Sequence, residues 1–425
     1  MALRQVCRSR LGWGWSGRLA LPTPSSSMNR ISLFCSSVGA GPSETVTHQM
    51  IDYAFSHARS QRSDGSYSDA LLVLEQGLSN LQRTDKSCEN SIGKILLAMS
   101  ALHSERGDLA TALDKAQLVH GLPFASLALR VAALESATDL HLQMGQDAAS
   151  LGLAEKCLQL LSEGSGADSV ENEALQLQAK ALKGLVDLVL GTPESAKPYF
   201  AGFETCGSEK ESSFCGRVAL SYAEYLHATG NLFLAKEYYQ KALLISPTKG
   251  LAETSVLGAL GMDGVHLSAN CALGQVATHT GKFKEAEEVL TGALKEVEEH
   301  FGSNHPKVGM VLTCMADMFR QKGTLDGSST LLIQEGLYRR AIDLMKAPSL
   351  DVEDIPSLRR DIVALARGGY AEALCVQQNR KSEGERMRRW AERAWTNRRM
   401  SLAQALDSAD ASNVCILDTR IERII

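Results

Sequence analysis

The side chains most able to do chemistry are ten histidines and ten cysteines. A zinc site needs ligands at spacings such as H-E-x-x-H or C-x-x-C, and neither pattern occurs in the chain. Gly258, Gly261 and Gly264 resemble a phosphate-binding loop, but no predicted strand precedes them and their spacing matches no nucleotide-binding motif. The sequence therefore predicts a protein that is not an enzyme and that holds no metal or cofactor.

One concentration of charge lies at residues 380–399, which carry eight basic and three acidic side chains, with Trp390 and Trp395 between them. Arginines beside tryptophans can bind RNA or an acidic protein. The alternative is a capping helix whose tryptophans pack on the last repeat, because a terminal repeat needs a polar outer face. The candidate basic patch consists of Arg386, Arg388, Arg389, Arg393, Arg398 and Arg399.

Charge also separates the start of the chain from the rest. Residues 1–43 hold five arginines and many serines but no acidic residue, which is typical of an organellar transit peptide. We predict import into mitochondria, with plastids as the alternative. The remaining residues carry a net charge of −10, so RNA binding would require a local basic patch. No apolar run approaches the roughly 18 residues of a membrane span.

The elements that must position these residues are helices. Proline is absent from residues 43–122, 124–192 and 357–425, and these tracts are rich in alanine and leucine. The same spacing of small residues occurs in two segments, at Gly230, Ala235 and Ala242 and at Gly281, Ala286 and Ala293. The glycine suits the left-handed end of a first helix, and the two alanines share one face of a second helix. Further copies start at Gly65, Gly107, Gly145, Gly191 and Gly323, with a degraded copy at Asn379.

These segments resemble the tetratricopeptide repeat (TPR) family, most clearly over residues 216–297. Glycine-to-glycine steps near 42 and the stretch Glu299–Pro306 before a new helix are similar to the kinesin light chain subtype. Its paired asparagines are replaced here, for example by Leu220 and Ser221. The resemblance implies stacked antiparallel helix pairs with a concave groove that binds a partner's peptide.

We predict an all-α fold, a right-handed α-solenoid of about eight helix-pair repeats. The expected domains are a disordered transit peptide at residues 1–43 and a TPR-like repeat domain at residues 44–425. Within the latter, residues 356–425 form a degenerate repeat and a basic C-terminal cap. His227 and His279, near the ends of first helices, are expected either to face the groove or to be partly exposed.

The predicted function is that of a non-catalytic scaffold or adaptor in an organelle, which binds an unidentified protein partner in its groove. No small-molecule substrate is expected. The alternative is an organellar RNA- or ribosome-associated factor that uses the basic C-terminal helix. The repeat register places seven side chains in the partner groove: Glu135, Asp139, Arg217, Glu224, Gln275, Asp317 and Arg320.

Overall fold

The computed structural model describes residues 44–82, 88–163, 170–203, 216–244, 254–327, 330–407 and 414–425. The predicted transit peptide lies outside these residues. The first described helix, α3, begins at Glu44, the first acidic residue of the chain. Among the described residues, no helix is both long enough and apolar enough to cross a membrane.

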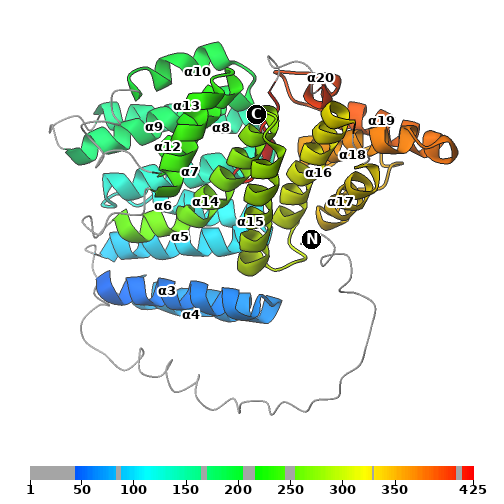
Figure 1. Ribbon diagram of the computed structural model, residues 1–425. Helices are drawn as coiled ribbons and strands as arrows, with labels where there is room; N and C mark the ends of the chain where they lie inside the picture. The colour runs from blue at the N-terminus through cyan, green and yellow to red at the C-terminus, as the bar shows by residue number, and fades with distance from the viewer. Residues whose placement is uncertain are drawn as a thin grey trace, which may run out of the picture. The chain divides into compact units, whose positions relative to one another are not determined.

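Antiparallel helix pairs follow one another along the chain (Figure 1). The pairs are α3 (Glu44–Gln61) with α4 (Asp64–Gln82), α5 (Glu89–Glu105) with α6 (Leu109–His120), α7 (Leu127–Gln143) with α8 (Asp147–Glu163), α9 (Val170–Val189) with α10 (Pro193–Phe200), α12 (Gly216–Ala228) with α13 (Leu232–Leu244), α14 (Thr254–His279) with α15 (Phe283–Phe301), α16 (Pro306–Asp326) with α17 (Leu331–Leu344), and α18 (Arg360–Cys375) with α19 (Lys381–Ala394). The 3-10 turn η3 (Gln378–Arg380) joins α18 to α19, and α20 (Leu402–Leu406) follows. The predicted all-α solenoid of about eight helix pairs is confirmed.

Glycines end the first helices in most of the pairs, as the repeat spacing predicts. The backbone is left-handed at Gly107, Gly145, Gly191, Gly230 and Gly281, a conformation that costs glycine little. Two predicted positions are wrong. Gly65 and Gly323 lie inside α4 and α16, and the left-handed residues at those turns are Arg62 and Gly327.

The small residues of the second helices lie where the repeat spacing places them. Ala235, Ala242, Ala286 and Ala293 are all buried, with at most 1% of their surface exposed. A larger side chain at these positions would have to enter the contact between neighbouring helices, so their size determines how closely the repeats stack.

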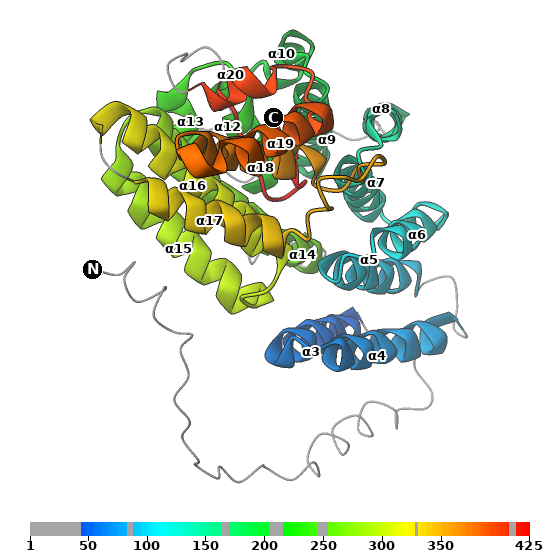
Figure 2. The same ribbon diagram turned by 90° about the vertical axis from the view of Figure 1, so that its right-hand side faces the viewer.

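Curvature of the repeat array brings distant repeats into contact. Helix α14 packs against α5 and α7, and α14 lies beside α5 in both ribbon views (Figures 1 and 2). The His305 side chain, before α16, donates from Nε2 to the Glu105 carbonyl at 3.2 Å. The Arg62 guanidinium donates to the Glu298 carbonyl at 3.3 Å. The loops of the first two repeats therefore meet the turn between the sixth and seventh.

Residues 414–425, the hairpin segment, depart from the expected C-terminal cap. Helices α18 and α19 form the last pair, and the chain then returns to the inner side of the array. There β1 (Leu417–Asp418) pairs with β2 (Arg423–Ile424) in antiparallel register. Val414, Ile416, Ile421 and Ile425 join the main hydrophobic core, which also contains buried residues of α7 to α14. The segment thus fills part of the surface that a partner was expected to occupy.

Candidate functional site

The inner surface binds the main chain of the hairpin segment through Gln275 on α14. The Gln275 amide nitrogen donates to the Leu417 carbonyl at 3.0 Å, and its Oε1 accepts from the Leu417 N–H at 2.7 Å. One side chain thereby satisfies both main-chain groups of a strand residue, whatever side chain that residue carries. The next two residues of the segment bond Ser268, also on α14: its Oγ lies 2.9 Å from the Asp418 carboxylate and 2.8 Å from the Thr419 hydroxyl.

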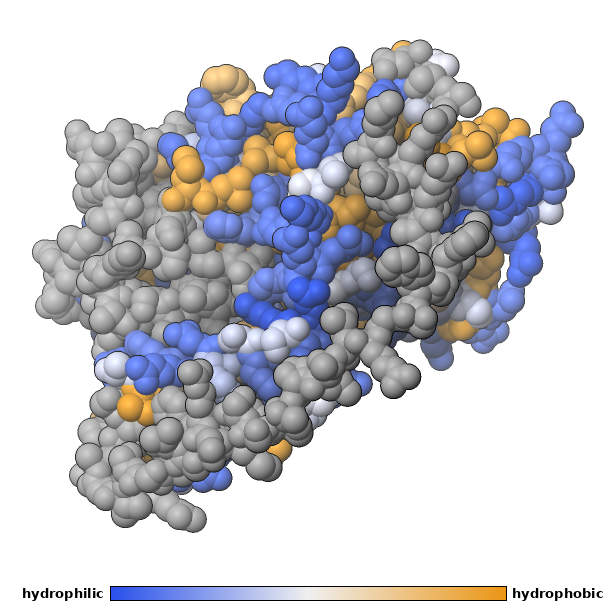
Figure 3. Space-filling model, turned by 60° about the horizontal axis from the view of Figure 1, so that its bottom comes forward, coloured by the Kyte–Doolittle hydropathy of each residue, from blue (hydrophilic) through white to orange (hydrophobic). Residues whose placement is uncertain are grey.

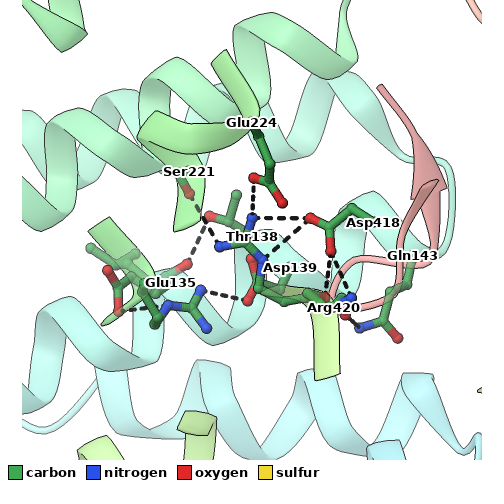
Figure 4. A network of polar contacts seen from close by, with 11 residues as sticks. Glu135, Thr138, Asp139, Gln143, Ser221, Glu224, Asp418 and Arg420 are labelled. Atoms are coloured by element: carbon green, nitrogen blue, oxygen red, sulfur yellow. Dashed lines mark hydrogen bonds and ion pairs between the residues drawn. The ribbon is translucent and has the colours of Figure 1, made fainter. Parts of the chain in front are cut away.

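Arg420 forms the polar centre of the site. Its guanidinium donates to Glu224 on α12 at 2.7 Å, to Asp418 at 3.0 Å and to Ser221 at 3.1 Å. Figure 4 shows Arg420 between Glu224 and Asp418. Both carboxylates are only 1% exposed. The cation is therefore held by groups that water cannot replace, which makes each partner costly to remove.

The two carboxyl groups beside Arg420 differ in their affinity for protons. Burial raises the pKa of Glu224 well above its usual value, and the charge of Arg420 only partly opposes this. Burial acts in the same direction on Asp418, but Arg420 and hydrogen bonds outweigh it and lower the pKa of Asp418. Asp418 is therefore the main counter-ion of Arg420, and Glu224 takes up a proton first.

A second set of contacts holds the other strand of the hairpin segment. Arg359, just before α18, forms an ion pair with Glu422 at 2.5 Å. Arg423 bonds Asp147, the first residue of α8, at 2.9 Å. Arg399 donates to the Ile425 carbonyl at 2.9 Å. Together with Glu224 and Gln275, these contacts join the third, fifth, sixth and eighth repeats through one short segment.

The chain itself engages the predicted groove residues. Glu224 and Gln275 bind the hairpin segment, so their assignment to a partner groove is corrected: in this structure they hold the chain's own residues. Arg217 on α12 pairs with Asp139 on α7 at 2.6 Å and approaches Glu135 at 3.9 Å.

The two remaining predicted groove residues, Asp317 and Arg320, make their contacts within the last repeats. Arg320 pairs with Asp317 at 2.6 Å and donates to the Leu406 carbonyl of α20 at 2.5 Å. The predicted groove residues thus bind two later segments of the same chain, the hairpin segment and α20.

The predicted basic patch divides between two environments. Arg386, Arg388, Arg389 and Arg393 are exposed on α19, and Arg398 is exposed after it. Arg399 instead turns inward to the hairpin segment, so its place in a surface patch is corrected. Trp390 is 3% exposed, beneath the Arg367 guanidinium at 3.9 Å, and Trp395 Nε1 donates to the Met400 carbonyl at 2.8 Å. Trp390 therefore packs inside the last repeat, where it cannot stack on a nucleic-acid base.

The paired histidines connect two repeats internally. His227 is fully buried, and its Nδ1 lies 3.1 Å from the Tyr239 hydroxyl. Its Nε2 lies 3.0 Å from Nδ1 of His279. Burial lowers the pKa of His279 to about 4 and holds that of His227 well below its usual value. The expectation of a partly exposed or groove-facing His227 is wrong, because neutral imidazoles here form a contact between α12 and α14.

A polar cavity of about 840 Å³ remains open beside the hairpin segment. Its walls come mainly from the first three repeats, the α15–α16 turn, the end of α17, the residues just before α18 and the hairpin segment, with one residue each from α12 and α14. Figure 3 views the body from the side of α3 and α4 and shows hydrophilic residues across the centre of that face. Sequence spacing gave no sign of this cavity, because its lining residues come from segments far apart in the chain.

The described residues include no group of three or more histidine, cysteine, aspartate or glutamate side chains arranged to hold a metal ion. Cys157, Cys271 and Cys314 are buried free thiols. Burial raises the pKa of Cys157 to about 12, so this thiol stays protonated and is a weak nucleophile at neutral pH.

Stacked helix pairs around an occupied inner surface define a helical-repeat protein. No protein-family model matches the sequence, and a search of curated proteins finds no match. Among solved structures, the crystal structure of BtubC (BKLC) from P. vanneervenii is similar at 12% identity and a TM-score of 0.40, covering 57% of this chain and 89% of that one. The fold assignment rests on the helix pairs themselves, and the kinesin light chain subtype stays a prediction.

Proposed function

We propose that the chain is a non-catalytic protein-interaction scaffold whose inner surface receives a peptide or helix of a partner protein. The observation that supports this is the bound hairpin segment. Gln275 pairs with its main chain, and Glu224 accepts from its arginine. An inner surface that holds a polypeptide of its own chain has the chemistry needed to hold one from another chain.

The partner binds beside the hairpin segment in this proposal. Displacing the segment would expose six large aliphatic side chains that are now buried: Val414, Ile416, Leu417, Ile421, Ile424 and Ile425. It would also leave Glu224 and Arg359 buried without their ion-pair partners, which is costly. A partner that uses the open cavity and its rim keeps all these contacts.

Cross-linking mass spectrometry tests whether the chain is such a scaffold. The tagged chain is purified from mitochondria together with its partners and treated with a lysine-reactive cross-linking reagent. We expect cross-links from the partner to Lys307 and Lys346, which line the cavity. Lys241 and Lys295 on the second helices α13 and α15 serve as internal controls and should be cross-linked rarely. Partner cross-links confined to the control lysines would refute an inner-surface partner.

The alternative of an RNA- or ribosome-associated factor is supported by the arginines that α19 exposes, for example Arg388 and Arg389. RNA recovered in the same purification, and lost when these arginines are replaced by serine, would favour it. Mitochondrial location is also part of the proposal. Its support is the arginine-rich, acid-free composition of residues 1–43.

A further inference from the structure

The cavity beside the hairpin segment is basic although the body of the protein is acidic. Eight basic and five acidic side chains line it. Three of the arginines are neutralised within the cavity by ion pairs of 2.5–2.6 Å: Arg59 with Glu105, Arg217 with Asp139, and Arg359 with Glu422. A fourth, Arg420, is neutralised by its ion pairs with Glu224 and Asp418. The excess of positive charge therefore comes from other residues.

Those residues are Arg62, Lys307 and Lys346. They come from the α3–α4 turn, the first turn of α16 and the end of α17, and all three line the cavity. Within the described part of the chain, none of them forms an ion pair with a carboxylate. Arg106 adds a fourth cation, whose one ion pair among the described residues is a 3.7 Å contact with the nearly fully exposed Asp64. Such a contact neutralises little charge in water.

Two of the three cations are held in place by uncharged groups. The Arg62 guanidinium donates to the Glu298 carbonyl, and Lys307 Nζ lies 5.3 Å from the ring centroid of Phe301. Phe301 also lines the cavity. These contacts position the charges without neutralising them.

The backbone around the cavity adopts a rare conformation at several of its lining residues. Four described residues other than glycine have a left-handed backbone, and all four line this cavity: Arg62, Lys346, Arg359 and Glu422, with φ of 52° to 55°. Side chains other than glycine or asparagine rarely adopt this conformation, and such strain gathers at binding sites. The fold therefore accepts a backbone cost that places three cations and one carboxylate around a single cavity.

We propose that this cavity is a binding site for a ligand that carries phosphate groups. Several cations that converge from separate repeats match a dianionic group with three acceptor oxygens better than a single carboxylate. The N-terminus of α16, at Pro306 and Lys307, adds the positive end of a helix to the same wall. The cavity volume of about 840 Å³ lies within the range of small-ligand sites.

The phosphate could belong to a small molecule or to a phosphorylated segment of a partner, and titration calorimetry on the full chain separates these sources. The probes are pyrophosphate, a phosphoserine peptide, and the same peptide with serine or glutamate in place of phosphoserine. Binding of pyrophosphate supports a small-molecule ligand, and binding of the phosphopeptide alone supports a partner segment. Binding of neither, or equal binding of the glutamate peptide, overturns the proposal.

A matched pair of variants locates the site. Arg62→Asn, Lys307→Gln and Lys346→Asn together remove three cations, and asparagine tolerates the left-handed backbone at two of these positions. We expect the phosphate probe to bind about tenfold more weakly or worse. The control carries Lys282→Gln, Lys284→Gln and Lys295→Gln, which remove the same charge from exposed positions near or on α15.

The control should bind within about twofold of the natural chain, because its lysines do not line the cavity. Equal loss in both variants would show that only net charge matters and would overturn the site. Thermal melts of both variants exclude unfolding as the cause. The proposal does not depend on the scaffold: partner cross-links at Lys307 without phosphate binding would overturn it and leave the proposed function intact.

Discussion

Replacing Arg420 with methionine tests whether the buried ion pairs hold the hairpin segment in place. Methionine keeps much of the length and volume of the arginine but removes the cation shared by Glu224 and Asp418. Both carboxylates are 1% exposed, so water cannot replace the lost partner. The substitution therefore isolates the electrostatic contribution from the packing contribution.

The expected cost is large. Removing one member of a buried ion pair typically costs about 3–5 kcal/mol, because a charge is left buried and uncompensated. Arg217→Met is the matched control. The Arg217 side chain is 25% exposed, and water can partly solvate Asp139 when the guanidinium is lost. We expect a cost of about 1 kcal/mol for this control.

Urea denaturation at neutral pH and at mildly acidic pH measures both costs. Arg420 opposes the effect of burial on both carboxyls, so we expect its loss to raise the pKa of Glu224, which already lies above the unfolded value, and that of Asp418. These carboxyls then bind a proton more tightly in the folded variant than in its unfolded chain, so their contribution to the stability of the variant becomes more favourable as the pH falls. The gap between the natural chain and Arg420→Met should narrow on acidification. A cost below about 1 kcal/mol that does not change with pH would refute this account of the site.

Four further outcomes are expected. Glu224→Gln should destabilise the chain less than Asp418→Asn in the same denaturation assay, because burial already favours a neutral group at Glu224 and Asp418 is the counter-ion of Arg420. Ala242→Arg should melt at a lower temperature than the control Gln240→Ala at an exposed position, since overpacking costs about 1–3 kcal/mol. Lys241 is a poorer position for the control, because its ammonium lies 4.3 Å from the ring centroid of Tyr238 and its replacement would also remove this contact. Burial lowers the pKa of His279 to about 4, so between about pH 6.5 and 4 the unfolded chain binds a proton that the folded chain does not. The free energy of unfolding should therefore fall on acidification across that window, and it should fall less steeply in His279→Gln than in the natural chain. A fluorescent reporter fused to residues 1–43 should co-localise with a mitochondrial marker, and a plastid or cytosolic signal would contradict the predicted address.

The repeat architecture could be predicted from the sequence because its determinants are local. The glycine that ends a first helix and the alanines of the second helix lie within about a dozen residues, as at Gly230, Ala235 and Ala242. Their conformational and packing preferences act between near neighbours, so spacing alone reveals them. The exceptions show the limit of this reasoning. At the α3–α4 turn Arg62 takes the left-handed backbone, and Gly65, which matched the pattern, lies inside the helix.

Which residues lie against the inner surface of the repeats was decided by the tertiary structure alone. Gln275 and Leu417 are 142 positions apart, Arg420 and Glu224 are 196 apart, and Arg423 and Asp147 are 276 apart. The apolar residues around Leu417 and Ile421 could have indicated a buried segment, but nothing in their spacing specifies which surface would bury them.

The cavity was equally invisible, because Arg62 belongs to the first repeat whereas Lys307 and Lys346 belong to the seventh. Helical periodicity reports which face of each helix is buried. The complementarity between groups hundreds of residues apart arises only when the curvature of the stacked repeats brings those faces together.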